Sequence, residues 1–290
     1  MDFDLTDLDL FEKGFPQHVF TWLRREAPVY WHEPTSHTPD GEGFWVVSRH
    51  ADALRVLLEH VGRELYESND AVRAANAGIR SYGTELIAHK RREPADDMLS
   101  VVIHAALPGE DPPSLTDAEL YVFFMLLFVA GSETTRKAIA VGLAALLETG
   151  EWERLQREPG RIDTAIEEIV RWTTPSVYKR RTLTRDVELG GQRLRAGDKL
   201  TFWEMSANRD DAVFEYPFRF DIGRDPNPHL GFGHSVHYCL GANLARLEIR
   251  VMLEELLALG HAIEITGDPV WTRDNRLFGL KHLPVRFDPR

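Results

Sequence analysis

The chain has 290 residues, of which 43% are hydrophobic and 28% charged, so it can build a sizeable core and is not disordered in composition. The net charge of −12 argues against nucleic acid and anionic membranes as partners. A single cysteine excludes an internal disulfide, and the acidic N-terminus lacks the apolar core of a signal peptide. The longest apolar run, 122–130, is far shorter than the ~18 residues of a membrane span. We therefore expect a cytoplasmic protein without a membrane anchor.

The hydrophobic pattern of the first hundred residues predicts mainly helices. The apolar run Trp45, Val46 and Val47 predicts a buried strand. Helices are expected on both sides of this strand, at 15–26, 51–60, 62–92 and 94–104. Prolines and a glycine within 107–113 then break the chain.

A long helix is predicted after this break. Thr116 and Glu119 have the spacing of a capping box, in which each side chain satisfies a free backbone N–H group at a helix start. No proline follows until beyond Glu148, so one helix should cover the whole stretch. Its first half is apolar on all sides, and we expect that half to be deeply buried.

The remainder of the chain mixes helices with short strands. A helix is expected at 163–172, strand segments at 187–189, 194 and 200–202, and a last helix at 242–259 before short C-terminal strands. The fold class is therefore mainly α with minor β. We expect one domain over 1–290, with a helix-and-strand portion at 1–60 and the long helix and later elements at 61–290.

The first chemically suggestive segment is 232–241, a glycine-containing loop that places Cys239 just before the last helix. A helix N-terminus stabilises a thiolate through its dipole and free N–H groups, and a thiolate is a soft metal ligand. Taken alone, a single cysteine is more often a small buried hydrophobe. The surrounding loop favours the ligand.

The second segment, 130–135, lies inside the predicted long helix. The small residues Ala130 and Gly131 would let a flat group approach the backbone, and Glu133 and Thr134 place an acid beside a hydroxyl. A buried polar group without a partner costs about 1–3 kcal/mol, so such a pair suggests a purpose. The alternative is a helix kink whose backbone is bonded by a side-chain hydroxyl.

The third segment holds Glu168 and Arg171, whose i,i+3 spacing puts an acid and a base on one helix face. Taken alone, such a pair is usually an ordinary surface ion pair. In this order and at these separations, however, the three segments together resemble the cytochrome P450 family. The resemblance covers 15–60 and most of 85–290, and the segments 206–210, 216–220 and 283–287 support it.

The resemblance implies a cytochrome P450-like fold that holds heme b. Cys239 would be the axial thiolate ligand of the iron, and His237 and Arg181 would pair with the heme propionates. Ala130, Gly131 and Phe232 would also contact the cofactor. The finer resemblance, carried by 226–233 and 241–246, is to soluble actinobacterial members that act on steroid and methyl-branched lipid side chains.

The implied activity is that of a heme-thiolate monooxygenase, an oxidoreductase. It would insert one oxygen atom from O2 into a small apolar substrate, with electrons from a ferredoxin-type donor. Glu133 and Thr134 would be catalytic, because oxygen cleavage in an apolar pocket needs positioned proton donors. Glu168, Arg171 and Arg219 would form a buried network that holds the cysteine loop.

Two departures from the family qualify this expectation. Ser235 stands where the family usually has glycine, and a positive φ there would cost on the order of 1 kcal/mol. The helices expected on the distal side of heme have no counterpart between about 60 and 85, as after a large internal deletion. The fold would then be incomplete on that side. The alternative function is a truncated, non-catalytic remnant that binds heme weakly or not at all.

Overall fold

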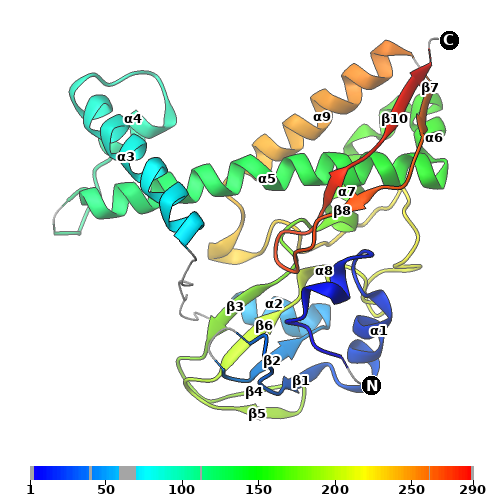
Figure 1. Ribbon diagram of the computed structural model, residues 1–290, viewed down its shortest axis with the longest axis horizontal. Helices are drawn as coiled ribbons and strands as arrows, with labels where there is room; N and C mark the ends of the chain where they lie inside the picture. Colours follow the sequence, from blue (N-terminus) through cyan, green and yellow to red (C-terminus); the bar gives the residue numbers. More distant parts are fainter. Residues whose placement is uncertain (1–2, 39–40, 59–69, 112, 261, 289–290) are drawn as a thin grey trace. The chain divides into compact units, whose positions relative to one another are not determined.

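The computed structural model describes residues 3–38, 41–58, 70–111, 113–260 and 262–288 (Figure 1). The chain forms two compact units, one made of Met1–Glu64 with Thr134–Arg290 and the other of Leu65–Glu133. The sequence predicted a single domain. That remains a prediction, and each unit is described by itself.

The larger unit contains a four-stranded sheet in the order β1-β2-β6-β3. The strands are β1 (Val29–His32), β2 (Phe44–Val47), β3 (Lys179–Thr182) and β6 (Lys199–Phe202). β1 and β3 run antiparallel to their neighbours, whereas β2 and β6 are parallel, with Trp45 opposite Leu200 and Val47 opposite Phe202. The sheet joins segments more than 150 residues apart in the chain, so it fixes where β3 and the following residues lie.

Short helices and a hairpin surround this sheet (Figure 1). Apolar side chains of α2 (His50–Leu58), among them Ala53 and Val56, share a core with Val47, Leu200 and Phe202. The other elements here are η1 (Leu8–Phe11), α1 (Gln17–Glu26), β4 (Val187–Leu189), β5 (Gln192–Leu194) and α8 (Glu204–Ala207). An aromatic cluster that includes Phe11, Phe20 and Trp203 joins η1 and α1 to the start of α8.

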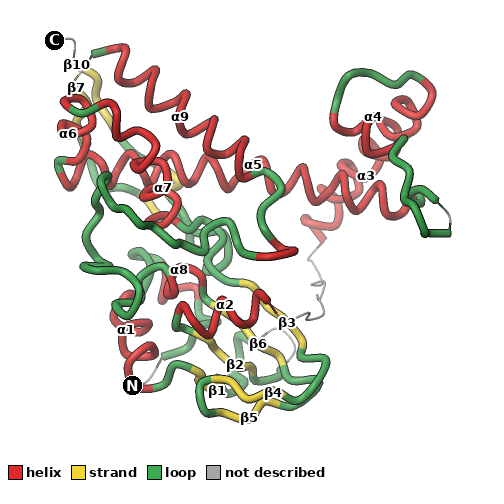
Figure 2. The backbone as a smooth tube through the Cα atoms, turned by 180° about the vertical axis from the view of Figure 1, so that it is seen from behind, coloured by secondary structure: helices red, strands yellow, loops and turns green. Residues whose placement is uncertain are grey.

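A helical layer forms the rest of the larger unit (Figure 2). It contains α6 (Glu151–Arg157), η2 (Pro159–Arg161), α7 (Ile162–Thr173), η3 (Ser235–His237), α9 (Ala242–Leu259) and the later part of α5 (Asp117–Thr149). The strands β7 (Ala262–Ile265), β8 (Val270–Trp271), β9 (Leu280–His282) and β10 (Val285–Asp288) follow, paired as β7 with β10 and β8 with β9.

The amphipathic pattern of α7 explains its central place in this layer. Ile162, Ala165, Ile166, Ile169 and Val170 recur at helical spacing and are all buried in one core with residues of α5, α6 and α9. The helix α5 approaches α7 closely at Gly142, where a Cβ atom would lie 2.6 Å from Ile169 Cγ2. Burial of this face therefore fixes the orientation of α7 and, with it, the positions of its charged residues, which include Glu167, Glu168 and Arg171.

The smaller unit is built from α3 (Asp70–Arg92), α4 (Met98–Ile103) and the first part of α5. Its core contains Ile87, Ile103 and Leu120. The predicted capping box is confirmed, since the Glu119 carboxylate accepts from the Thr116 N–H at 2.8 Å and the Glu119 N–H donates to Thr116 Oγ1. These two bonds account for the start of α5 at Asp117.

The predicted fold class, mainly α with minor β, is confirmed. The last helix begins and ends where the sequence placed it, whereas 94–97 are not helical because Asp97 caps α4 through a bond from the Ser100 N–H. Residues 59–69 lie outside the described residues. They include the start of the helix predicted at 62–92 and part of the stretch, about 60 to 85, where distal helices were expected to be absent. The predicted burial of the first half of α5 was wrong, because Val122, Phe128 and Val129 are all about half or more exposed.

The helix α5 also bears on membrane association. Among the described residues it is the one helix whose length and apolar composition would allow it to cross a bilayer. The core helices of proteins that never enter a membrane have the same length and composition. The absence of a membrane anchor therefore stays a prediction.

Candidate active site

The cysteine loop leads into α9 and presents a thiol to solvent. Cys239 is exposed, and the Ala242 N–H at the start of α9 donates to its carbonyl at 3.2 Å. The Cys239 N–H donates to the carbonyl of Phe232 at 2.8 Å, which ties the two arms of the loop together. The backbone of the loop thus holds Cys239 directly before the N-terminus of α9.

Two residues in the loop need the left-handed region of backbone space. Gly233 has φ of +71°, and a Cβ atom there would lie 2.9 Å from the His237 carbonyl oxygen. Ser235 has φ of +56°, which confirms that the position needs a positive φ. A side chain in this region costs on the order of 1–3 kcal/mol. Ser235 therefore stores strain beside Cys239.

Glu168 and Arg171 form a fully buried ion pair on α7. Their side chains are 0% exposed, and Arg171 Nε donates to Glu168 Oε2 at 2.7 Å while Nη2 donates to Oε1 at 2.8 Å. Two parallel bonds of this kind are the strong geometry for an arginine and a carboxylate. The alternative of an ordinary surface ion pair is excluded by this burial.

The third member of this network differs from the predicted one. Arg219 is exposed and contributes its backbone carbonyl, which accepts from Arg171 Nη2 at 3.2 Å. Arg171 already has its carboxylate partner and needs further acceptors, so carbonyls surround it rather than another cation. The second guanidinium on Glu168 comes instead from Arg224, at 3.1 Å from Oε2, with Asn227 Nδ2 at the same distance.

The sequence did not reveal a second network beside the first. Glu167 accepts from Arg246 Nε at 2.6 Å and Nη2 at 3.0 Å, and its Oε2 lies 3.0 Å from His229 Nε2. Burial alone would raise the pKa of Glu167, but the bonds from His229 and Arg246 outweigh it and lower the pKa to about 2. The pair of adjacent glutamates at 167 and 168 was the available signal, because neighbours on a helix point about 100° apart and can serve two separate networks.

Comparison with known proteins decides the family. A sequence profile of cytochrome P450 matches residues 161–286, which hold both networks and the cysteine loop. The chain is 41% identical to cytochrome P450 126 of Mycobacterium tuberculosis, over 97% of this chain and 96% of the relative. The chain belongs to the cytochrome P450 family. Members of this family are monooxygenases, a class of oxidoreductases.

Other P450 relatives cover less of their own length. A methyl-branched lipid omega-hydroxylase of Mycobacterium bovis is 43% identical over 79% of this chain and 54% of the relative. A steroid C26-monooxygenase of Mycobacterium tuberculosis is 38% identical over 82% of this chain and 63% of the relative. Among solved structures, a cytochrome P450 of Mycobacterium marinum in complex with pseudoionone matches with a TM-score of 0.81, 28% identity and 94% coverage of both chains.

The length of one alignment bears on the expected deletion. The match to cytochrome P450 126 runs over 399 residues, whereas this chain has 290, so at least 109 positions of the alignment have no residue here. This chain therefore lacks a substantial part of the sequence of cytochrome P450 126, although the alignment runs over 96% of that relative. The place of the missing residues in the chain stays a prediction.

The surroundings of Cys239 fit heme. Val236 and Leu240 are 72% and 73% exposed, Tyr238 lies next to the cysteine, and Leu244 is exposed on the first turns of α9. Exposed apolar side chains gathered in this way mark a binding surface, and a large flat apolar group would cover them. A thiolate is also the donor that iron accepts in this family. The thiol and the exposed apolar side chains of the loop therefore agree with the implied cofactor.

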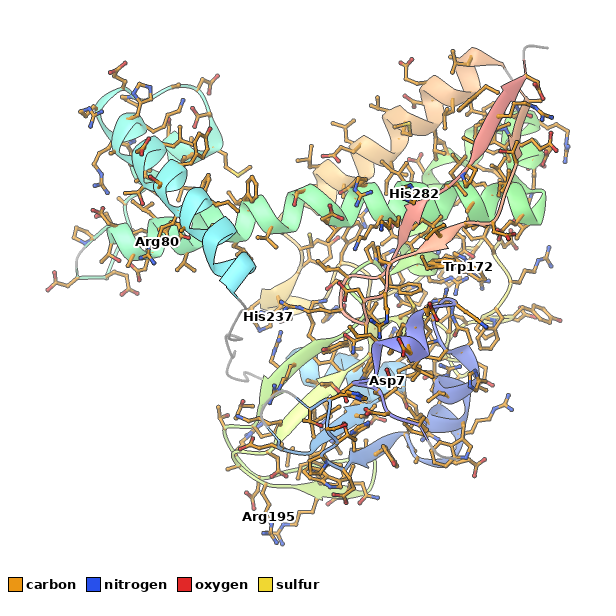
Figure 3. All side chains as sticks on the ribbon, viewed as in Figure 1. Asp7, Arg80, Trp172, Arg195, His237 and His282 are labelled. Carbon is orange, nitrogen blue, oxygen red and sulfur yellow. The ribbon has the colours of Figure 1, made fainter. Side chains whose placement is uncertain are left out.

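The two predicted propionate partners lie in different elements of the larger unit. Arg181 is buried in β3, where its guanidinium lies 5.4 Å from the centre of the Phe202 ring and donates to the Arg180 carbonyl. His237 lies in the loop before α9 and is exposed (Figure 3). Their role as propionate partners remains a prediction.

The predicted catalytic segment 130–135 lies within α5, and the division of the chain into two units falls between Glu133 and Thr134. Ala130 and Gly131 are exposed, while Glu133 and Thr134 are half-buried. Ser132 Oγ lies 3.4 Å from the Val129 carbonyl, which is the side-chain to backbone contact of the alternative interpretation. The roles of Glu133 and Thr134 in catalysis, and of Ala130 and Gly131 in cofactor contact, remain predictions.

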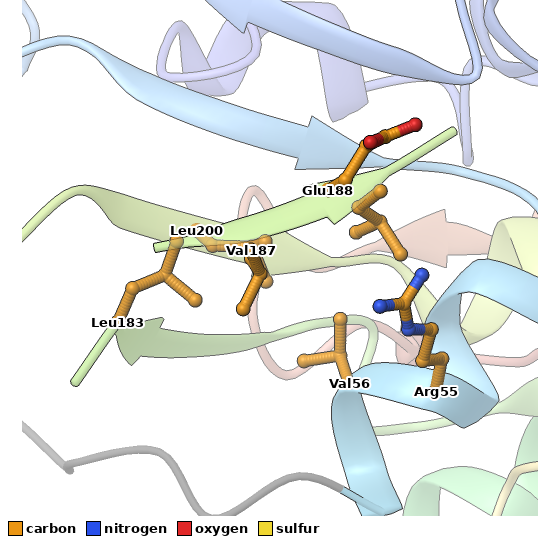
Figure 4. A pocket seen from close by; sticks show the side chains of 7 residues that line it. Arg55, Val56, Leu183, Val187, Glu188 and Leu200 are labelled. Carbon is orange, nitrogen blue, oxygen red and sulfur yellow. The ribbon is translucent and has the colours of Figure 1, made fainter. Parts of the chain in front are cut away.

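A small cavity lies away from the cysteine loop (Figure 4). Arg55 and Val56 of α2 face Leu183, Val187 and Leu200 around it. Its volume of about 10 Å³ leaves room for at most about one water molecule. It is therefore a packing defect of the core beside the sheet and cannot hold a substrate.

Proposed function

We propose that this protein is a heme-thiolate monooxygenase in which Cys239 ligates the heme iron. The observation that carries the proposal is the exposed thiol of Cys239, which a braced loop holds among exposed apolar side chains. Cys239 is the only cysteine of the chain, so no other residue can supply a thiolate. When bound, heme supplies oxygen activation, and a thiolate ligand favours O–O cleavage.

The chain's own residues would position the cofactor and handle protons. His237 and Arg181 would pair with the propionates, while Phe232, Ala130 and Gly131 would contact the ring. Glu133 and Thr134 would hold water and pass protons into an apolar site, a role that suits a positioned acid and alcohol. The Glu168 and Arg171 pair would keep the segment before the cysteine loop in place.

The substrate class follows from the relatives. A methyl-branched lipid hydroxylase and a steroid monooxygenase are among them, so we infer a small apolar substrate of the steroid or branched-lipid type. A ferredoxin-type protein would donate the electrons. We also propose a cytoplasmic location, and the net charge of −12 argues against a nucleic-acid partner.

A second candidate function is favoured by the missing alignment positions. Heme is retained by burial of both faces, and a chain that lacks at least 109 aligned positions offers less surface for this purpose. An open edge also admits water, which promotes side reactions. The alternative is therefore a non-catalytic remnant that binds heme weakly or not at all.

An absorption spectrum tests the two candidates. The purified chain is loaded with hemin, reduced and exposed to carbon monoxide, and its heme content is measured per chain. A thiolate-type band at stoichiometric heme supports the monooxygenase, whereas little or no heme supports the remnant. Cys239→Ser should lose the thiolate-type band even where heme still binds. A variant that keeps the band would rule out Cys239 as the ligand.

A further inference from the structure

The carboxylate of Glu167 connects both arms of the cysteine loop to α7. Its Oε2 lies 3.0 Å from Nε2 of His229, at the loop entrance, and both oxygens accept from Arg246, which follows the loop on α9. The His229 side chain is only 4% exposed. The Glu167 side chain on α7 thus contacts residues at both ends of the loop.

The entrance arm is fixed through the His229 ring. The Gly231 N–H donates to Nδ1 of His229 at 3.2 Å, so Nδ1 accepts and the ring proton belongs on Nε2, facing Glu167. Gly231 itself lies against α7, because a Cβ atom there would be 2.7 Å from Val170 Cγ1. The ring therefore relays the position of Glu167 to the backbone at the start of the loop.

The exit arm is fixed through the Arg246 guanidinium. Arg246 lies 4.5 Å from the centre of the Phe232 ring and donates to the Tyr238 hydroxyl at 3.1 Å. Phe232 accepts the N–H of Cys239 through its carbonyl, and Tyr238 precedes Cys239 in the chain. The same guanidinium thus contacts the two residues whose backbones hold the cysteine.

We propose that Glu167 is a positioning residue that sets the place of the Cys239 sulfur by clamping His229 and Arg246. This inference rests on the proposed function, because it concerns the residue that would ligate the iron. The clamp is separate from the buried Glu168 and Arg171 pair, which contacts the carbonyls of Asn208, Pro217 and Arg219. Glu167 touches neither the cysteine nor the surface that heme would cover, so it acts through the loop.

Backbone hydrogen exchange in the heme-free chain tests the clamp without reference to the cofactor. In Glu167→Gln one oxygen becomes an NH2 group that faces donors, and in Glu167→Ala both acceptors are lost. Exchange in a peptide spanning 230–241 should become roughly ten- to a hundredfold faster, the loss expected for one charge-assisted hydrogen bond. Peptides from the buried face of α7 should keep their rates.

Three further variants separate positioning from general stability. Glu254→Gln breaks an exposed ion pair on α9, the helix that carries Arg246, with Arg250 Nη1 3.4 Å from Glu254 Oε1, and should leave the loop unchanged. His229→Gln should preserve the slow exchange, because an amide can donate to Glu167 and accept from Gly231, whereas His229→Ala should not. Unchanged exchange at 230–241 in both Glu167 variants would overturn the proposal, as would an equal rise across the chain.

The spectrum of the heme-loaded variants gives an independent readout. Glu167→Ala should reduce the share of the thiolate-type band in the reduced carbon monoxide complex, and Glu254→Gln should match the unmodified protein. If the unmodified protein shows no such band, the proposed function fails while the exchange experiment still decides the clamp. A full thiolate-type share in Glu167→Ala, stable over hours, would refute the clamp although Cys239 remained the ligand.

Discussion

Removal of the Glu168 carboxylate should unfold this protein or leave it without heme. The carboxylate accepts from Arg171 Nε and Nη2, from Arg224 Nε, from Asn227 Nδ2 and from the Asp221 N–H, at distances between 2.7 and 3.1 Å. Glu168→Ala deprives all these donors of an acceptor and leaves the Arg171 cation in a site with no exposure to water. A broken buried pair typically costs about 3–5 kcal/mol.

This cost is large in comparison with the stability of a typical domain. Native proteins are stable by only about 5–15 kcal/mol, so a loss of about 3–5 kcal/mol would remove about a fifth or more of that stability. Urea unfolding followed by circular dichroism measures it directly. Glu254→Ala is the matched control, since its partner Arg250 is on the surface and such pairs contribute about 0–1 kcal/mol.

A double variant tests whether charge burial is the cause. Glu168→Leu with Arg171→Met removes both charges and should be more stable than Glu168→Ala alone. The recovery should be partial, because the carbonyls of Asn208 and Pro217 lose the donor that they share. The reasoning fails if Glu168→Ala unfolds within about 1 kcal/mol of the unmodified protein and retains heme.

Three other changes give separate tests. Thr134→Ala should divert electrons to hydrogen peroxide in any chain that turns over, because proton delivery of this type contributes about 10²–10⁴-fold to the rate. The coupling of NADH use to product measures this effect, with Ser132→Ala as the control. Unchanged coupling in Thr134→Ala would contradict the role of Thr134. Ser235→Gly should raise the free energy of unfolding by up to about 1 kcal/mol, because relief of the left-handed strain outweighs the extra conformational entropy of glycine in the unfolded chain. A loss of stability in urea unfolding would show that the serine is not strained. The pKa of Glu167 is about 2, below its ordinary value of 4.5. The unfolded chain therefore binds more protons between these two pH values, and the contribution of Glu167 to stability is lost as the pH falls from about 4.5 towards 2. The free energies of unfolding of the unmodified protein and of Glu167→Gln should therefore converge as the pH is lowered. Parallel curves of stability against pH would contradict this contribution of Glu167.

The amino-acid sequence by itself determined the local elements of this protein. The capping box at Thr116 and Glu119, the bounds of α9 and the acid–base spacing on α7 all depend on residues within a few positions of one another. Periodicity and turn chemistry are local, so a single sequence contains them. Strain at Ser235 was expected only for the case of a positive φ, and the φ of +56° meets that condition.

Only the tertiary structure decided which distant side chains meet. Arg224 rather than Arg219 reaches Glu168, and Glu167 meets both His229 and Arg246, which are 62 and 79 residues away. These contacts depend on the path of the chain between α7 and α9 and on which carbonyls point inward. No local sequence pattern predicts the path or the direction of the carbonyls. The exposure of Val122 and Phe128 was decided in the same way. An apolar helix is buried only where other elements cover it, so its composition alone does not determine its surroundings.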